Sequence, residues 1–324
     1  MAVILAAGEA LEKAAKLILA GNPVAVPTET VYGLAADATN GDAVARIYEV
    51  KARPRFNPLI VHVDGMEMAE GIGEFDPLSR RLAAKFWPGP LTLVLPLKKG
   101  ADIHPLVRAG LDTIALRMPT GFISRLIART GRPLAAPSAN SSGHISGTSA
   151  PAVEADLGAR IALIVDDGPT PVGVESTIVK IEGERLRLLR PGGLAAEEIE
   201  EAAGLKLERG APAGVEAPGM LSSHYAPRAR VRLNAAEIAA GEALLAFGPK
   251  RAKGADAAKA VRNLSPRGSL REAAANLFSM LHELDATGAS VIAVEPIPFD
   301  GLGEAINDRL RRAAAPRDIE SRTA

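Results

Sequence analysis

The sequence predicts an α/β protein of two domains: an open, twisted, mixed sheet with flanking helices, followed by a smaller Rossmann-like α/β domain. A chain of 324 residues exceeds the usual size of a single hydrophobic core. Short β-branched runs alternate with helical patterns through about the first 200 residues. A stretch rich in Gly, Pro and Ala then interrupts this alternation before it resumes.

The first domain is expected over residues 1–204, and it opens with a helix over 8–20. Apolar residues at near-helical spacing predict this helix, and Gly21 follows where a C′ glycine belongs. Because strict βαβ order is not evident, we expect a mixed sheet. Strand-like runs lie at 24–26, 58–63, 91–97, 112–118, 133–138, 161–166 and 176–181, and helical patterns lie at 42–50, 77–86, 121–130 and 151–158.

The segment 205–227 is predicted to be a linker because of its Gly, Pro and Ala content. It carries His224 and Tyr225, which would be unusual in a passive tether, so we expect it to close over a site. A small α/β domain is expected over 228–324. Its strand-like runs are 229–233, 243–248 and 290–297, and its helical patterns are 235–240, 269–286 and 302–314.

The composition argues against several classes of function. Lys and Arg number 38 against 38 Asp and Glu, so no overall field attracts a polyanion. Aromatic residues make up only 3% of the chain, which leaves little for a base-stacking platform. The sequence has no cysteine, which excludes disulfides, a thiolate nucleophile and cysteine-ligated metals.

The sequence shows no targeting or membrane-spanning signal. The N-terminal stretch MAVILAAGEALEK lacks a basic flank and is too short for a signal peptide. No apolar run reaches the length of a membrane span. We therefore expect a cytoplasmic protein with no membrane contact, and the lack of cysteine fits a reducing compartment.

Two early segments place polar side chains beside strands. In PTETVYGLAAD, residues 27–37, the polar residues could present side chains at a sheet edge or merely satisfy a turn. In KARPRFNPLIVHV, Lys51, Arg53 and Arg55 would share one face if the segment is extended, and could there bind phosphate oxygens. A solvated charge run is the alternative. His62 follows within the strand, where a lone histidine is more often structural than catalytic.

Three later segments add hydroxyls and arginines. Thr113 and Arg117 lie four apart in a predicted strand, hence on one face, and an arginine there could hold a carboxylate or a phosphate. The segment PLAAPSANSSGHISGTSA, residues 133–150, packs small hydroxyls among glycines, which suits an anion or nucleotide site, although it could be a flexible loop. GVESTIV and LRLLRPGG place Ser176 and Arg190 near strand ends. The sequence has no Walker A motif and no complete dinucleotide fingerprint.

Taken together, these motifs resemble the YrdC-like family of threonylcarbamoyl-AMP synthases. The resemblance rests on PTETVYGL, Lys-x-Arg-Pro with NPLIVHV, FWPGPLTLVL, LRMP, APSAN with SG, GVESTI and LLRPGG, in the family's order over about residues 8–200. PGMLSSHYAP and the domain after it are similar to the longer, two-domain branch. The sequence departs from the family in having KARP where glycine often follows the lysine, and LRMPTG where a histidine often follows the proline.

The resemblance implies a concave basic cavity in which ATP and L-threonine bind side by side. Threonine would be held by Thr30, His62, Arg117, Ser176 and the backbone at Ala136. ATP would be held by Lys51, Arg53, Asn57, Thr113, Ser138, Ser146 and Arg190, with Tyr225 closing over the nucleotide from the linker.

The implied reaction makes L-threonylcarbamoyl-AMP from L-threonine, bicarbonate and ATP and releases pyrophosphate. The threonine amine would capture carbon dioxide, and the resulting carbamate would attack the α-phosphorus of ATP. Such a nucleotidyltransferase depends on positioning and charge neutralisation, which we assign to Lys51 and Arg53 with Mg²⁺ accompanying ATP and no metal ligand from the protein. The product would pass to a separate tRNA threonylcarbamoyl transferase complex, for modification of the adenosine next to the anticodon.

Two other functions compete with this interpretation. A carbamoyl-transfer enzyme of hydrogenase maturation would carry cysteine-rich zinc motifs, which the sequence lacks. A double-stranded RNA-binding module would bind RNA in a salt-sensitive way without turning over ATP, and the balanced charge speaks against it. A weak RNA contact remains compatible with the enzyme.

Overall fold

The computed structural model describes residues 1–183, 185–210, 214–221 and 223–316. The chain divides into two compact units. The first comprises residues 1–142 and 146–220, and the second comprises 143–145 and 221–324. The division after Met220 falls within the segment expected as a linker, so residues of that segment belong to both units.

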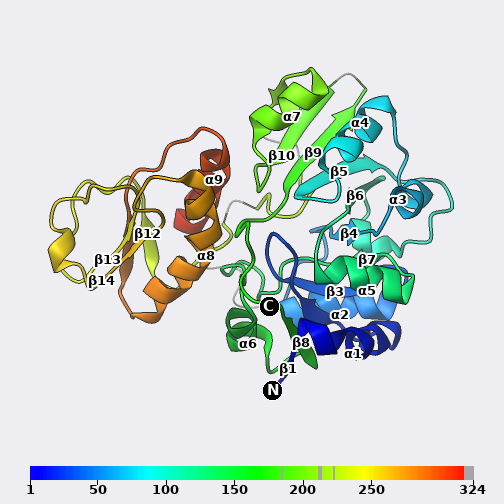
Figure 1. Ribbon diagram of the computed structural model, residues 1–324, viewed down its shortest axis with the longest axis horizontal. Coiled ribbons are helices and arrows are strands. Elements are labelled where there is room, and N and C mark those ends of the chain that lie inside the picture. Colours follow the sequence, from blue (N-terminus) through cyan, green and yellow to red (C-terminus); the bar gives the residue numbers. More distant parts are fainter. Residues whose placement is uncertain (184, 211–213, 222, 317–324) are drawn as a thin grey trace. The chain divides into compact units, whose positions relative to one another are not determined.

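The first unit is built on one large sheet, which is mixed as expected (Figure 1). β1 pairs with β8 in parallel and β2 with β3 in antiparallel, while β5 is antiparallel to β6 and parallel to β9. Within the described residues it has eleven strands, in the spatial order β1 (Val3–Ala6), β8 (Leu163–Asp166), β2 (Val24–Val26), β3 (Gly33–Asp37), β7 (Leu134–Ala135), β4 (Ile60–His62), β6 (Thr113–Arg117), β5 (Leu91–Pro96), β9 (Thr177–Glu182), β10 (Arg185–Arg190) and β11 (Leu207–Glu208).

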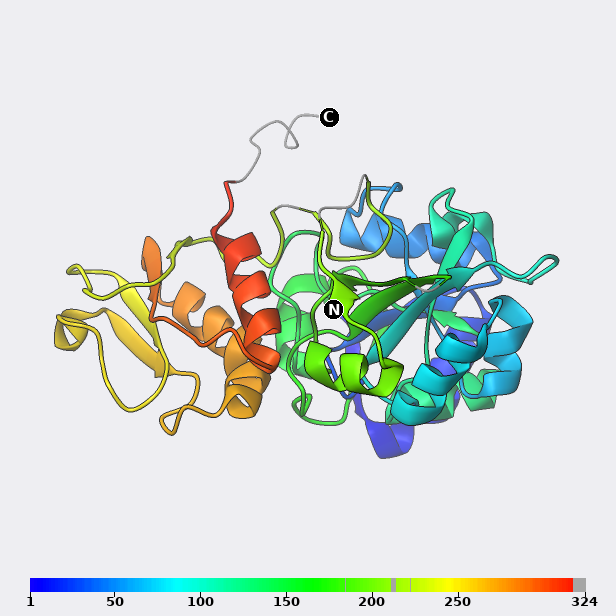
Figure 2. The same cartoon turned by 90° about the horizontal axis from the view of Figure 1, so that it is seen from above.

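Helices pack on one face of this sheet. The helices on that face are α2 (Gly41–Lys51), α3 (Met66–Ile72), α4 (Pro77–Phe86), α6 (Ala150–Leu157) and α7 (Ala196–Ala203), and each contributes to the largest hydrophobic cluster. Their starts carry the expected signals: Asn40 caps α2 through its side chain, and Asp76 followed by proline caps α4. Figure 2 shows α4 and α7 side by side on this face.

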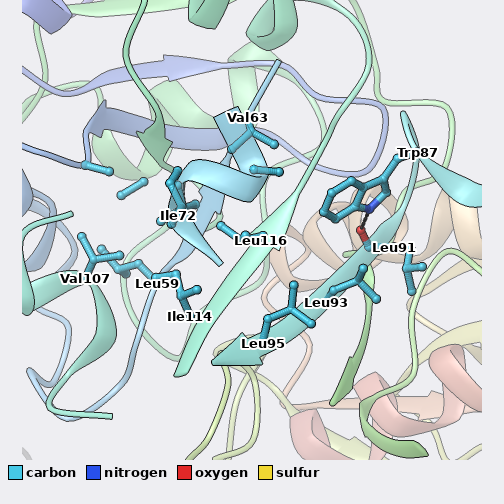
Figure 3. Packing of buried hydrophobic residues seen from close by; sticks show 14 of the residues in the cluster. Leu59, Val63, Ile72, Trp87, Leu91, Leu93, Leu95, Val107, Ile114 and Leu116 are labelled. Carbon is cyan, nitrogen blue, oxygen red and sulfur yellow. Dashed lines mark hydrogen bonds between the residues drawn. The ribbon is translucent and has the colours of Figure 1, made fainter. Parts of the chain in front are cut away.

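The core of this layer forms where alternate residues of the central strands meet the helices. Figure 3 shows Leu93 of β5 and Leu116 of β6 directed toward the same cluster as Ile72 of α3. The Trp87 indole borders the cluster, and its Nε1 donates a 2.7 Å hydrogen bond to the carbonyl oxygen of Leu91. Because side chains alternate along a strand, the residues between these leucines face the opposite side of the sheet.

Helices cover only part of the opposite face. α1 (Ala7–Leu19) and α5 (Phe122–Thr130) lie side by side and pack over β1, β8, β2, β3 and β7 (Figure 1). Over β4, β6, β5, β9 and β10 the same face carries a smaller cluster that includes Ala115 and Ile178. That cluster is covered by Ala217 and Met220 of the segment after β11. This half of the face, which α1 and α5 leave uncovered, carries His62 of β4 and Arg117 of β6.

The second unit is a small α/β domain with a parallel sheet, which confirms the expected fold class. Its strands are β12 (Arg230–Arg232), β13 (Ala243–Ala246), β14 (Ala260–Asn263) and β15 (Val291–Val294), in the order β12-β15-β13-β14. α8 (Leu270–Ala286) packs on β13 and β14, and α9 (Leu302–Ala314) packs on β12 and on α8. In both Figure 1 and Figure 2 the two helices lie on the same side of these strands.

Two short 3₁₀ turns complete the elements of the described chain, at Pro105–Arg108 and Ala255–Ala257. The expected helix over 235–240 is wrong: this segment is irregular, because Glu237 bridges to Lys253 and the Ile238 amide donates to the Lys253 carbonyl. Across the described ranges, no helix is long and apolar enough to cross a membrane.

Candidate active site

The pairing of β4 with β6 brings two candidate residues, His62 and Arg117, side by side. His62 and Arg117 are Cα partners in the parallel ladder of β4 and β6, so both side chains project from the uncovered half of the sheet. The exposed fraction of each residue is small, 2% for His62 and 3% for Arg117. A loop before β3 supplies Thr30, which is also buried. Residues far apart in the sequence therefore meet in one buried polar cluster.

Arg117 is fixed by three different groups. Its Nη1 donates to Thr30 Oγ1 at 2.9 Å, and its Nε donates to the Gly89 carbonyl oxygen at 3.2 Å. Its Nη2 lies 2.6 Å from Oε1 of Glu29 in a buried ion pair. Thr30 in turn exchanges a 2.8 Å hydrogen bond with the Thr28 hydroxyl. The guanidinium is thus pre-organised to hold an anion such as a carboxylate.

His62 is a neutral side chain at neutral pH. Burial lowers its pKa to about 3, and the positive charge of Arg117 lowers it further in the same direction. Its Nδ1 is buried without a hydrogen-bond partner. An imidazole in this state can offer a hydrogen bond to a ligand without adding charge.

A second group of contacts surrounds the start of β9. The Ser176 hydroxyl shares a 2.7 Å hydrogen bond with Thr92 and accepts one of 3.2 Å from Arg190 Nη2. Arg190 also donates to the Ser176 carbonyl oxygen, at 2.9 Å from Nη2. The Ala136 amide donates to the Ile60 carbonyl oxygen at 3.1 Å, which holds the loop after β7 against β4.

Lys51 and Arg53 are both buried, but not for the reason that the sequence suggested. The segment is not extended: Lys51 is the last residue of α2, and Ala52 turns the chain with a left-handed φ of 49°. Lys51 Nζ donates to the carbonyl oxygens of Ser138, at 2.6 Å, and of Asn140. Arg55 lies exposed, so the expectation that all three cations share one face is wrong.

The electrostatics of Lys51 and Arg53 are those of desolvated cations. Burial, together with the nearby positive charge of Arg53, holds the pKa of Lys51 well below its usual range. Arg53 Nη2 donates to Asn57 Oδ1 at 2.7 Å and to the Pro58 carbonyl oxygen at 2.8 Å. Asn57 Nδ2 is buried and without a hydrogen-bond partner, so it is available to a ligand.

Specific contacts hold two serines of the serine- and glycine-rich loop. Ser146 is fully buried, and its hydroxyl donates a 2.6 Å hydrogen bond to Glu175 Oε1. Ser138 forms an isolated bridge with Gly33, and its carbonyl oxygen receives Lys51. This loop therefore joins the Lys51 group to the group around β9.

One tight backbone contact explains why glycine stands at position 192 in LRLLRPGG. A Cβ atom at Gly192 would lie 2.3 Å from the Glu175 carbonyl oxygen and 2.4 Å from the Ser176 carbonyl carbon. Only glycine allows the loop after β10 to approach the 175–176 backbone so closely. The loop thereby braces both Ser176 and Glu175.

The structure gives Thr113 and Tyr225 other neighbours. Thr113 is at the other end of β6 from Arg117, about 13 Å along the strand. There it lines a surface pocket of about 480 Å³ together with Val94 and Lys180. Tyr225 belongs to the second unit, where its ring stacks on Phe278 with centroids 5.5 Å apart.

Comparison with known proteins identifies the family. The Sua5/YciO/YrdC family, described as telomere recombination, matches residues 16–192, and the family described as threonylcarbamoyl-AMP synthase, C-terminal domain, matches 194–315. A threonylcarbamoyl-AMP synthase of Bacillus subtilis is 41% identical and covers 95% of this chain and 94% of its own length. The chain belongs to the threonylcarbamoyl-AMP synthase family. Its relatives of that name are enzymes of the transferase class.

The family relationship extends over both units. A threonylcarbamoyl-AMP synthase of Pyrococcus abyssi is 41% identical over 99% of this chain and 100% of its own. The crystal structure of P. abyssi Sua5 complexed with L-threonine superposes with a TM-score of 0.85 and 39% identity over 94% of each chain. The sequence-based assignment to the family and to its two-domain form is therefore confirmed.

Sequence reasoning did not assign a role to several residues of this threonylcarbamoyl-AMP synthase family site. Glu29 was considered as a sheet-edge or turn residue without a specific role, yet it pairs with Arg117. Glu175 and Thr92 bond the hydroxyls of Ser146 and Ser176. Glu29 and Glu175 lie within PTETVYGL and GVESTI, so the motifs contained the signal, but only the fold pairs these residues with partners more than 25 positions away.

Proposed function

We propose that this protein synthesises L-threonylcarbamoyl-AMP from L-threonine, bicarbonate and ATP and releases pyrophosphate. The observation that supports the proposal most strongly is the set of buried cations in the first unit, in a chain of the threonylcarbamoyl-AMP synthase family. Lys51, Arg53, Arg117 and Arg190 are each at most 7% exposed. Buried cations need anionic partners, and the proposed substrates carry a carboxylate and a triphosphate.

L-threonine is assigned to the pocket around Arg117. The guanidinium would hold the substrate carboxylate, while Thr30, His62 and Ser176 offer hydrogen-bonding groups to the rest of the amino acid. The backbone at Ala136 would contribute a further contact. The related P. abyssi Sua5 forms a crystalline complex with L-threonine, which supports this assignment.

ATP is assigned to the groups around Lys51 and β9. Lys51, Arg53 and Arg190 would neutralise phosphate oxygens, and Asn57 has a free buried amide to offer. The further proposed contacts are Thr113, Ser138, Ser146 and, from the segment before the second domain, Tyr225.

The reaction needs positioning more than a protein nucleophile. The neutral amine of threonine attacks carbon dioxide derived from bicarbonate, and a carbamate oxygen then attacks the α-phosphorus while pyrophosphate leaves. Lys51 and Arg53 stabilise the charge that develops on the phosphates. Mg²⁺ would arrive with ATP, because it prefers substrate phosphates, and the described residues contain no group of three potential metal-ligating side chains.

The product is a reactive mixed anhydride, so a second enzyme has to consume it promptly. We infer transfer to the adenosine next to the anticodon of tRNA by a separate threonylcarbamoyl transferase complex in the cytoplasm. A weak RNA contact on this protein would be compatible with that transfer.

Pyrophosphate release from ATP by the purified protein tests the proposed function. The assay contains Mg²⁺ and compares L-threonine, L-serine and no amino acid, each with and without bicarbonate. Release that requires both threonine and bicarbonate is expected. RNA binding that is sensitive to salt, with no release under any condition, would favour a double-stranded RNA-binding module instead.

A further inference from the structure

Glu29 is a buried carboxylate to which the proposed function assigns no role. Its side chain is 11% exposed, and its Oε1 lies 2.6 Å from Arg117 Nη2. Its Oε2 accepts a 3.2 Å hydrogen bond from the Thr120 amide, so the carboxylate is held from two sides. Its own carbonyl oxygen accepts from Val172, which fixes the backbone as well.

The ion pair leaves hydrogen-bonding capacity unused on both partners. Oε1 of Glu29 and Nη2 of Arg117 are buried, and neither has a hydrogen-bond partner of good geometry, despite their short separation. Buried polar atoms in this state are rare in native proteins and call for a specific explanation. A ligand that supplies one acceptor and one donor, on neighbouring atoms, would satisfy both.

We propose that Glu29 is the binding subsite for the ammonium group of the amino-acid substrate, and that the Arg117–Glu29 pair together recognises a zwitterion. This inference rests on the proposed function, in which Arg117 binds the substrate carboxylate. In an α-amino acid a single carbon atom separates the carboxylate from the amine. A ligand whose carboxylate lies on Arg117 therefore carries its amine close to Glu29.

Charge balance makes the pair selective. The zwitterion keeps the pocket neutral, because its carboxylate satisfies Arg117 while its ammonium satisfies Glu29. An anion without the amine would compete with Glu29 for Arg117 and leave a buried carboxylate unpaired. The neighbouring groups do not replace Glu29: His62 is uncharged at neutral pH, and Glu175 accepts from Ser146.

Calorimetric titration of wild-type protein and Glu29→Gln tests this inference without turnover. Gln keeps the shape of the side chain and an oxygen to accept from the Thr120 amide. The ligands are L-threonine and its des-amino analogue 2,3-dihydroxybutanoate of matching stereochemistry. We expect Glu29→Gln to weaken threonine binding by about 10- to 100-fold, the range for a lost charged hydrogen bond, and to leave analogue binding equal or tighter.

Other outcomes separate this inference from the proposed function. If wild-type protein binds no threonine at all, the proposed function itself fails. If wild-type protein binds threonine and Glu29→Gln lowers the affinity for threonine and for the analogue equally, Glu29 merely positions Arg117 and the inference is overturned. The inference is also overturned if the variant binds both ligands as tightly as wild type. Should the variant not fold, wild-type protein alone decides: an analogue that binds as tightly as threonine contradicts an ammonium subsite. The exposed Glu49→Gln on α2 is the matched control and should bind like wild type.

Discussion

Lys51 illustrates how a residue's surroundings can differ from those that its sequence pattern predicts. The sequence suggested an extended segment with three cations on one face, whereas a left-handed turn at Ala52 separates the end of α2 from Arg53. That turn points Lys51 at two carbonyl oxygens and buries Arg53 against Asn57. A positive φ at alanine is uncommon, and nothing in the local sequence signals it.

Replacing Lys51 or Arg53 by alanine should reduce threonine-dependent pyrophosphate release by about 100-fold or more, because each would remove a cation that stabilises phosphate charge. Thermal unfolding should change far less than turnover. Arg55→Ala, two residues further on and exposed, is the control and should retain wild-type rates. Normal turnover in either test variant would show that its cation has no part in the reaction.

His62 makes folding stability dependent on pH. Its pKa falls from 6.5 to about 3 on folding, so below pH 6.5 the unfolded chain binds a proton that the folded chain excludes. This histidine therefore favours unfolding increasingly as pH falls from 6.5 toward 3. At pH 4.5 it lowers the free energy of unfolding by about 2–3 kcal/mol relative to neutral pH. Urea unfolding at pH 7 and 4.5 should show a smaller stability loss in His62→Gln than in wild type. If wild type and His62→Gln lost the same free energy of unfolding between pH 7 and 4.5, the account of His62 as a neutral buried imidazole would be contradicted. His144→Gln, at an exposed position, is the control and should behave like wild type.

At the scale of elements, the site depends on contacts that no single segment contains. Sequence patterns located most of the helices and the apolar strands, because amphipathic helices and β-branched runs bury recognisable residues. Among the elements that they missed are β3, whose sequence GLAAD has small residues, and α7, which has few large apolar residues. They could not supply the ion pair of Glu29 with Arg117, since that depends on packing between distant strands.

The loop after β10 should tolerate no side chain at Gly192. Gly192→Ala would push a methyl group into the Glu175 carbonyl and displace the backbone of Ser176. We expect a stability loss of about 1–3 kcal/mol, as for other overpacked positions, together with weaker ATP binding. Denaturant unfolding and nucleotide titration measure the two effects. Gly71→Ala in α3 has open space around it and should not be destabilising, so equal behaviour of the two variants would refute the close contact.

The segment 214–220 is held on the sheet face by ion pairs. Glu216 contacts Lys180 at 2.5 Å and Arg187 at 2.9 Å, while Ala217 is fully buried in the cluster beneath. These carboxylate contacts are partly exposed, so removing them should lower the free energy for opening of this segment by only about 1 kcal/mol. Glu216→Gln should therefore speed amide hydrogen exchange in 214–220 by about fivefold at low salt, with a smaller difference at high salt. Unchanged exchange would mean that apolar packing alone holds the segment, and Glu208→Gln, which removes the Arg185 pair, is the control.

At the scale of the whole molecule, fold class and family could be predicted from the sequence. The alternation of apolar strands with helical patterns led to both α/β units, and motifs in series led to the family, which the comparisons confirm.

The role of the second unit stays a prediction. At the carboxyl end of β15, an inner strand of this sheet, Glu295 accepts hydrogen bonds from the Phe247 and Ala252 amides and from Arg251, so the chain's own carboxylate occupies a position where such folds often bind anions. The closing role predicted for Tyr225 is likewise open to experiment.

The most direct test of the proposed synthesis follows the atoms into the product. The protein is incubated with ATP, Mg²⁺, ¹³C-bicarbonate and ¹⁵N-L-threonine, and the quenched mixture is analysed by mass spectrometry and NMR. We predict one adenylate that contains both labels, with ¹³C bonded directly to ¹⁵N and pyrophosphate formed in equal amount. An adenylate that contains threonine but no ¹³C would contradict the account, because threonine would then be activated through its own carboxylate and not through a carbamate.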